Sequence, residues 1–279
     1  MVTGATGRIG RRVVDELVAA DAPVRALSRS PGQAGLPPGV EVVAGDLTVP
    51  ASLDAALHGV RTVFLLWTAP LSTAPAVVDR IASQAERVVL LSSPHQTPHP
   101  FFQQPNPAAT LHAELERLIA ESRLRSTVIR PGMFASNTIH WWSDAIRNDM
   151  PVRWPYADAE TAPIDERDLA AVVARALLDD AHAGGDYVLT GPESLSQAEQ
   201  AHRIGAAIGR AVRFEELSPE EFRAAGAAWP PVVLDMLLAA WDATMGQPAY
   251  VTSTVGDILG RPARTFAQWA DDNAAAFSP

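Results

Sequence analysis

Three glycines near the N-terminus, each three residues from the next, constrain the fold of this chain more than any other feature. Gly4, Gly7 and Gly10 lie in the run Gly-Ala-Thr-Gly-Arg-Ile-Gly, between a short apolar segment at 1–3 and a helical pattern over 8–20. Glycines at this spacing suit a tight turn, a close approach of the backbone to a pyrophosphate, and close packing of a helix on a strand. A helix N-terminus also offers free N–H groups to phosphates. The turn predicts a dinucleotide site; the alternative is a degenerate turn that keeps the fold without the ligand. The residues expected at this site are Gly4, Thr6, Gly7, Arg8 and Ile9.

Strand and helix patterns alternate after this turn. Apolar strand patterns occupy residues 1–3, 23–27, 40–44, 62–66, 87–91 and 126–130, and helical spacing occupies 8–20, 50–58, 73–85 and 107–122. Such alternation is typical of parallel βαβ units. The strands are apolar nearly throughout, as expected where helices cover both faces of the sheet. The predicted fold class is therefore α/β, a Rossmann-type doubly wound parallel sheet.

The pattern changes after residue 131. Helices are predicted over 134–148 and 165–178, a late strand over 186–189, and helices over 196–209, 219–225, 231–243 and 265–275. We expect residues 1–190 to form the dinucleotide-binding domain, with 132–160 contributing to a substrate cleft. Residues 191–279 are expected to form a smaller, mainly helical lobe. The proline-rich stretch 94–107 is a long irregular loop, and such loops often bind ligands or act as lids.

Composition excludes several kinds of chemistry. The net charge of −10 and the pI near 5.1 argue against nucleic acid or an anionic membrane surface as partner. The chain has no cysteine and no lysine, which excludes disulfides, thiolate chemistry, Schiff bases and a P-loop lysine. It shows no leader segment and no apolar run of about 18 residues, so the expected location is the cytoplasm. The seven histidines are scattered, and no metal site is expected. Monomer and homodimer both remain open.

The residues after the second predicted strand indicate whether the cofactor is NAD(H) or NADP(H). An NAD enzyme usually places Asp or Glu there, to accept from the ribose hydroxyl. This chain instead has Arg29 with a serine on each side, which suits the 2′-phosphate of NADP(H). NADP(H) is therefore preferred and NAD(H) is possible; the alternative for Arg29 is a solvated surface residue. Asp46 and Leu47 are expected near the adenine, and Trp67 and Thr68 near the ribose or nicotinamide.

Segments along nearly the whole chain resemble one family in their order and spacing. They are VTGATGRIG at 2–10, VRALSRSP at 24–31, GDL at 45–47, LHAELERLIAES at 111–122, STVIRPGMFASN at 126–137, IDERDLAAV at 164–172 and YVLTGPESLS at 187–196. The chain thus resembles the NmrA-like, atypical branch of the short-chain dehydrogenase/reductase superfamily. The resemblance implies a Rossmann domain, a smaller C-terminal lobe and a substrate cleft between them. Family members include quinone and dye reductases, hydroxylation-linked enzymes of aromatic polyketide pathways, and redox sensors that bind cofactor without turnover.

The chain departs from classical members of that superfamily, which use a Tyr-x-x-x-Lys pair. It has no lysine, and His112 lies on the helix where that lysine is expected. We predict that His112 bonds the nicotinamide ribose or the substrate oxygen and transfers a proton. Glu116, four residues later, is expected to orient the imidazole; the alternative is a surface pair. Ser92, at the end of the strand 87–91, is predicted to bond cofactor or substrate, the alternative being a strand-end cap.

An aromatic-rich set is expected around the cleft, because flat substrates favour such linings. The predicted substrate-binding residues are His95, Phe101, Phe102, Met133, Phe134, Asn137, Trp141 and Trp142. Aromatic residues in helices often belong to the core instead. One of the two adjacent tryptophans is expected to point out of the core, since neighbouring helix positions face about 100° apart. Asp165 and Asp168 are expected to act as helix caps and ties between the lobes.

Three functions are consistent with the sequence. The first is NAD(P)H-dependent reduction of an aromatic, quinone-like substrate by hydride transfer, without metal or flavin. The second is an O₂-dependent hydroxylase (monooxygenase) of an aromatic polyketide quinone, which uses NAD(P)H but neither flavin nor metal. The third is a non-catalytic redox sensor that binds NAD(P) and a partner protein.

Overall fold

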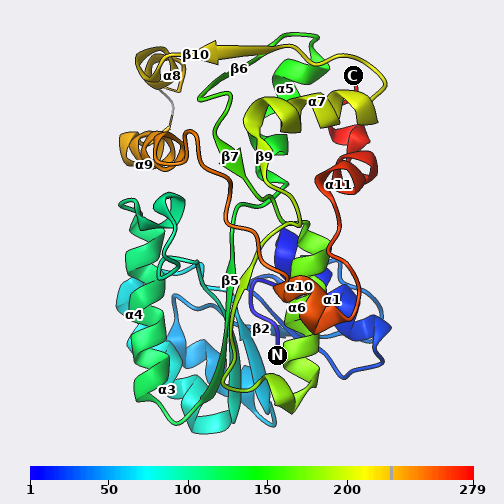
Figure 1. The fold of residues 1–279 in the computed structure, drawn as a ribbon. Coiled ribbons are helices and arrows are strands. Elements are labelled where there is room, and N and C mark those ends of the chain that lie inside the picture. Colours follow the sequence, from blue (N-terminus) through cyan, green and yellow to red (C-terminus); the bar gives the residue numbers. More distant parts are fainter. Residues whose placement is uncertain (227–228) are drawn as a thin grey trace.

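A parallel β-sheet forms the lower half of the molecule in the computed structural model, which describes residues 1–226 and 229–279 (Figure 1). Two strands, β1 (Arg25–Ser28) and β2 (Glu41–Ala44), pair in parallel on one side. Four more pair in parallel in the order β3, β4, β5, β8: β3 (Thr62–Leu65), β4 (Arg87–Leu91), β5 (Arg125–Pro131) and β8 (Asp186–Leu189). The predicted Rossmann-type sheet is confirmed.

The strand expected at 1–3 is reduced to one residue. Val2 bridges Ala26 of β1 and Phe64 of β3, and so joins the two parts of the sheet. The backbone of Val2 donates to the Arg25 carbonyl at 2.8 Å, and that of Thr3 to the Phe64 carbonyl at 3.0 Å. The strand ends there because Gly4, with a φ of 61°, turns the chain.

Helices cover both faces of the sheet. On one face α1 (Arg8–Ala19) packs beside α6 (Glu166–Leu178), and their buried residues share a core with Phe64 and Val89. The other face carries α2 (Leu53–Leu57), α3 (Ala74–Gln84) and α4 (Pro107–Glu121), which pack against Val63 and Val88. Neighbouring residues of a strand point to opposite faces, so apolar residues are needed at every position. Short 3-10 helices join these elements at Pro31–Gln33, Pro50–Ser52, Leu71–Thr73, Pro100–Gln103 (η4), Asp180–His182 and Ala274–Ala276.

The second lobe lies above the carboxyl ends of β4 and β5 (Figure 1). Its helices are α5 (Asn137–Arg147), α7 (Gln197–Ala207), α8 (Pro219–Ala225), α9 (Pro231–Asp242) and α11 (Phe266–Asp272). It also contains four short strands that the sequence analysis did not predict: β6 (Val152–Pro155), β7 (Glu160–Thr161), β9 (Leu195–Ser196) and β10 (Phe214–Leu217). They form two separate pairs, β6 with β10 and β7 with β9. Two of them, β7 and β9, have only two residues each, too few to show a period.

One helix between α9 and α11 packs against the first domain instead of the second lobe. This helix, α10 (Thr254–Leu259), was not predicted; it is six residues long and ends at Gly260, which is left-handed with a φ of 66°. Val255 is fully buried in the same core as α1 and α6. The segment 191–279 therefore contributes to both halves of the molecule. None of the helices in the described parts of the chain combines the length and the apolar character that crossing a membrane requires.

Candidate functional site

The glycine turn has the geometry that a pyrophosphate needs. Gly4 is left-handed, and the N–H of Gly7 donates to its carbonyl at 2.9 Å. A Cβ on Gly10 would lie 2.1 Å from the Gly4 oxygen, so this third glycine allows α1 to approach the turn. Gly7 begins α1 with no side-chain cap and no acidic residue in the first turn. Thr6, Gly7 and Arg8 are exposed and Ile9 is half-buried. The first N–H groups of α1 are thus available to an anion, and these residues fit a dinucleotide.

The segments after β1 and β2 lie close together. Arg29 is exposed, and among the described residues it forms no ion pair. The hydroxyl of Ser28 accepts from the Ser30 N–H at 3.1 Å and so shapes the turn around Arg29. The Asp46 carboxylate accepts from the Thr48 N–H at 2.8 Å, which holds the pKa of Asp46 below its usual value, with a smaller contribution from Arg29. The structure therefore brings together two of the residues expected around the adenosine.

The remaining residues expected at the cofactor differ in exposure. Leu47 is buried and packs in the first domain. Trp67, after β3, is half-buried against the same core, and within the described chain its buried Nε1 has no hydrogen-bond partner. Thr68, the next residue, is exposed. Arg8 lies 3.1 Å from His140 of α5, measured between Nη2 and Nε2, so the glycine turn also contacts the second lobe.

A cavity of about 320 Å³ lies between the two lobes. Six parts of the chain form its walls. Four of them are the residues after β4, the loop 94–107, the start of α4 and the residues after β5. The other two are α5, and α9 together with Trp229, which precedes it. Of the residues predicted to bind substrate, it is lined by His95, Phe101, Phe102, Met133, Asn137 and Trp141. The other lining residues are Ser93, Pro94, Gln104, Asn106, Ala109, Trp229, Val233, Met236, Leu237 and Ala240. No Arg, Asp or Glu occurs among these described lining residues.

Two predicted substrate-binding residues do not line this cavity. Trp142 is 1% exposed and packs edge-on against Trp154 in the core of the second lobe. Phe134 pairs through its backbone with Ile164 and packs against the core of the first domain. Trp141 stacks on Trp154 with ring centroids 5.3 Å apart and reaches the cavity. The expectation that one of the adjacent tryptophans points out of the core is confirmed.

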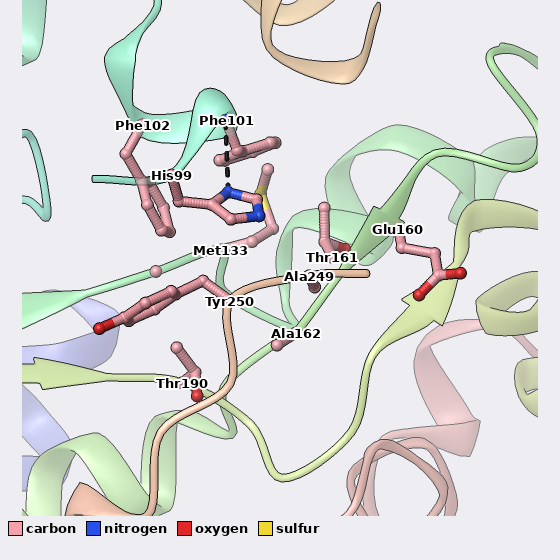
Figure 2. Close-up of a pocket in the computed structure, with 11 residues that line it drawn as sticks. His99, Phe101, Phe102, Met133, Glu160, Thr161, Ala162, Thr190, Ala249 and Tyr250 are labelled. Carbon is pink, nitrogen blue, oxygen red and sulfur yellow. Dashed lines mark hydrogen bonds between the residues drawn. The ribbon is translucent and has the colours of Figure 1, made fainter. Parts of the chain in front are cut away.

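A smaller pocket adjoins the cavity and shares Phe101, Phe102 and Met133 with it (Figure 2). His99 accepts from the Phe101 N–H at 3.3 Å and donates through Nε2 to the Pro248 carbonyl at 3.1 Å. Its ring lies 5.9 Å from that of Phe102 and 6.0 Å from that of Tyr250. His99 therefore fastens the loop 94–107 to the chain segment before α10. The pocket itself is too narrow for a ring system.

Beside the cavity, a carboxylate and an arginine form a buried pair. Glu116 of α4 accepts from both terminal nitrogens of Arg130, at 2.7 and 2.9 Å, and from the hydroxyl of Ser92. Arg130 also donates to Asp186 at 2.6 and 3.0 Å. Glu116 thus holds Arg130 and Ser92, and it forms no hydrogen bond with His112, the residue it was expected to orient. Ser92 is 4% exposed and its hydroxyl is engaged with this pair.

Two imidazoles flank the Glu116–Arg130 pair. His112 lies on the same face of α4 as Ala109 and Glu116, and among the described residues its buried Nδ1 has no partner. Burial lowers the pKa of His112; His95 and Arg130 lower it further, and Glu116 opposes them. His95 lies 3.1 Å from the Ser93 carbonyl through Nδ1, so this nitrogen carries the proton. Its buried Nε2, 3.9 Å from Glu116, is also without a hydrogen-bond partner there. Each ring keeps one buried nitrogen without a partner in the described chain. His95 lines the cavity, whereas His112 and Ser92, the two predicted catalytic residues, are not among its lining residues.

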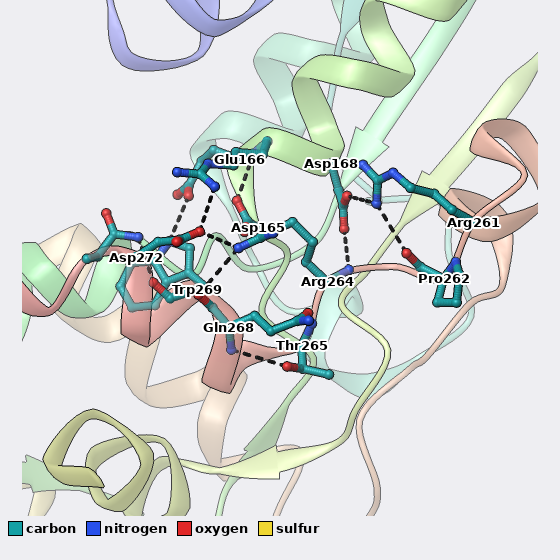
Figure 3. Close-up of polar contacts among 12 residues, drawn as sticks. Asp165, Glu166, Asp168, Arg261, Pro262, Arg264, Thr265, Gln268, Trp269 and Asp272 are labelled. Atoms are coloured by element: carbon teal, nitrogen blue, oxygen red, sulfur yellow. Dashed lines mark hydrogen bonds and ion pairs between the residues drawn. The ribbon is translucent and has the colours of Figure 1, made fainter. Parts of the chain in front are cut away.

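A third polar cluster joins the two lobes away from the cavity (Figure 3). Asp165 caps α6 through the Arg167 N–H at 2.8 Å and accepts from the Arg264 side chain at 2.6 Å. Asp168 accepts from the Arg264 backbone N–H at 2.6 Å and pairs with Arg261 at 2.8 Å. Asp165 is thus both a cap and a tie, as predicted, whereas Asp168 ties α6 to residues 261–264 and does not cap a helix. In residues 1–226 and 229–279, no three His, Asp or Glu side chains are grouped to hold a metal ion.

Comparison with known proteins adds three findings. A family model described as NAD(P)H-binding matches residues 4–180. The chain is 37% identical to a (4-alkanoyl-5-oxo-2,5-dihydrofuran-3-yl)methyl phosphate reductase of Streptomyces griseus, over 100% of this chain and 99% of the relative. It is 33% identical to an NAD(P)H azoreductase of Xenophilus azovorans, over 99% and 98%. Among solved structures, the NADPH complex of the quinone oxidoreductase QOR2 of Escherichia coli has a TM-score of 0.82 at 24% identity, over 97% of this chain and 98% of that one.

Proposed function

Because this chain belongs to the NAD(P)H-binding family and is an NAD(P)H-dependent oxidoreductase, we propose that it reduces a flat, quinone-like compound in the cavity between its lobes. The resemblance to the NmrA-like reductases, stated from sequence motifs, is confirmed by these relatives. The observation that carries the proposal is the aromatic, uncharged lining of a cavity at the carboxyl ends of β4 and β5. In open α/β sheets, ligands bind at that edge.

The reaction requires one hydride and one proton for each quinone reduced to a hydroquinone. Bound nicotinamide dinucleotide supplies the hydride. Phe101, Phe102 and Trp141 hold the ring by stacking and exclude water from it. His112 would take up a proton from solvent, deliver it to the oxygen on which negative charge develops, and return to the neutral form that burial favours by lowering its pKa. Glu116 accepts from both Ser92 and Arg130 and holds them in place.

The cavity also favours an uncharged substrate over a phosphate monoester, the substrate class named for the Streptomyces griseus relative. A phosphate group needs cationic or multiple N–H partners. Among the described lining residues, His95 is the one side chain that can become positively charged. A neutral quinone, or another conjugated carbonyl compound, is the better fit to these walls.

For the cofactor we propose NADP(H), held at its 2′-phosphate by Arg29. The support is the exposed guanidinium of Arg29, which forms no ion pair among the described residues, in a segment (24–30) that contains no acid to bind a free ribose hydroxyl. Arg29→Ala should raise the KM for NADPH about tenfold, the value of one charge-assisted hydrogen bond, and leave the KM for NADH unchanged. Arg61→Ala, at the opposite end of the sheet, is the matched control. An equal loss for both cofactors would contradict the assignment.

The function is tested by measuring NADPH and NADH oxidation with naphthoquinones and anthraquinones, under air and under nitrogen. Turnover at the same rate in both atmospheres, with one quinone reduced per NADPH, is the expected result. Turnover that requires O₂ and places oxygen in the product would replace the proposal by the hydroxylation alternative. Cofactor binding without turnover of any acceptor in the panel would count against quinone reduction and favour the sensor alternative.

A further inference from the structure

Helix α9 has two apolar faces, and the protein core covers one of them. Leu234, Leu238 and Trp241 are 4%, 3% and 1% exposed and pack in the core of the second lobe. The second face, defined here as the α9 wall, consists of Val233, Met236, Leu237 and Ala240. Leu237 and Ala240 are 8% and 7% exposed, and the half-buried Val233 and Met236 carry most of the apolar surface that this face offers to a ligand. These residues are spaced at i, i+3, i+4 and i+7 and line the cavity together. A helix that is apolar on both faces needs an apolar partner on each.

The opposite wall of the cavity is polar and aromatic. Ser93 and His95 follow β4, and Asn137 begins α5 after β5. These positions adjoin the sheet edge where the reactive ring must meet the cofactor, and the buried Nε2 of His95 is free for a ligand there. The α9 wall lies on the second-lobe side, so it faces the part of a substrate that does not react.

The α9 wall also differs chemically from the aromatic residues that hold the ring. It is aliphatic, and Met236 can adapt its unbranched side chain to a flexible partner. From Val233 to Ala240 it extends about 10 Å along the helix. The small side chain of Ala240 leaves room at one end. No Arg, Asp or Glu lies among the described lining residues, so a chain with an anionic end has no counter-ion.

We propose that the substrate carries a flexible, uncharged alkyl chain of several carbons, which lies along the α9 wall while the conjugated ring occupies the polar end of the cavity. This inference rests on the proposed function, since it assigns the ring to that end. It makes Val233 and Met236 specificity-determining residues. Each methylene buried against α9 should lower the apparent Kd up to about fourfold, until the wall is filled.

The experiment compares 1,4-naphthoquinones that carry unbranched 2-alkyl chains of increasing length, with the full-length protein and saturating NADPH. We expect kcat/KM to rise with each added methylene and then to level off, with a total gain of at least tenfold over the unsubstituted ring. The double variant Val233→Thr, Met236→Gln should lose most of this gain, so that long chains are affected about tenfold more than the unsubstituted ring. Val232→Thr is the matched control: Val232 is 55% exposed, one position earlier on α9 and outside the cavity lining, so the dependence should persist.

The two proposals fail in different ways. If the unsubstituted naphthoquinone is reduced but kcat/KM does not depend on chain length, the inference is overturned and the proposed function stands. If no quinone is reduced, the proposed function fails. Binding is then followed by quenching of tryptophan fluorescence, because Trp141 and Trp229 line the cavity. A Kd that falls with chain length, and does so less in the double variant, supports the inference; a Kd that is independent of chain length overturns it.

Discussion

Two clusters of arginine and carboxylate side chains, one with residues from α6 and the other with Glu116 of α4, differ in how completely their polar atoms are paired. In the interlobe clasp, formed by Asp165, Asp168, Arg261 and Arg264, each of the four carboxylate oxygens has a nitrogen within 2.8 Å. In the cavity-side cluster, Glu116 and Arg130 satisfy each other, while the adjacent His95 and His112 each keep one buried nitrogen without a partner in the described chain.

The difference shows how similar residues serve different purposes. Buried polar groups are nearly always hydrogen-bonded, so a cluster that satisfies itself has nothing left to offer a ligand. The clasp comes close to this: Asp168 Oδ1 has no hydrogen-bond partner in the described chain, but Arg261 pairs with it as an ion at 2.8 Å, so the value of the clasp lies in stability. The cavity-side cluster leaves acceptors or donors at its edge, beside a cavity, which is the arrangement expected of a site.

The largest expected effect comes from breaking the clasp. Asp168→Ala removes the acceptor of the Arg264 backbone N–H and the partner of Arg261, at a side chain that is fully buried. The free energy of unfolding, measured with urea, should fall by about 3 kcal/mol. Asp257→Ala on the exposed face of α10, where the carboxylate bonds Ser253, should cost under about 1 kcal/mol. A loss of quinone turnover without a loss of stability would place the clasp in the active site.

The second-largest expected effect is on turnover, and it tests the role of His112 in the cavity-side cluster. His112→Gln should lower kcat about 100-fold, because the proton donor is lost, while the free energy of unfolding changes by less than about 1 kcal/mol. His202→Gln, an exposed position on α7, is the control and should be neutral. A variant with normal kcat but a raised KM for NADPH would show that His112 binds the ribose and does not transfer a proton.

The smallest effect concerns pH. The pKa of His112 is lowered by burial, while in the unfolded chain it titrates near 6.5. Below that pH the unfolded state therefore binds more protons, and the stability contributed by neutral His112 is lost as the pH falls. The urea midpoint of the wild type should decrease between pH 7.5 and 5.5 more steeply than that of His112→Gln. Parallel curves would mean that the imidazole is not protected from water.

The glycine turn could be recognised from the sequence because it is local. One turn of seven residues carries its three glycines, and the strands around it are long enough to show a pattern. The α9 wall was not predicted, although apolar residues on two faces of 231–243 were a usable signal. Arg130 was also missed as a cluster member. An arginine between Ile129 and Pro131 in a buried strand indicates an ion pair, since lone buried charges are rare.

The rest of the site depends on contacts between distant segments. The cavity takes residues from six parts of the chain, and no single-sequence period shows which of them meet. Glu116 shares a helix face with His112, as expected, but its hydrogen-bond partner is Arg130 of the neighbouring strand β5. The same reason applies to Trp142 and Phe134. The sequence shows two aromatic residues near the predicted cleft, but it does not show that Trp142 packs into the core of the second lobe and Phe134 against the core of the first domain.

The clasp also has a consequence for how the chain reaches its native state. Its bonds join residues 96 and 99 positions apart, and the adjacent bond from Trp269 to Glu166 spans 103. Contacts this distant form late, because a long loop must close before they contribute. During synthesis the carboxylates of α6 therefore leave the ribosome well before their arginines. Asp165 and Glu166 also have partners nearer in sequence, the N–H groups of Arg167 and Ser136. The contacts of these acids and of Asp168 with residues 261–269 form only after that segment has been translated, so the first domain is completed late.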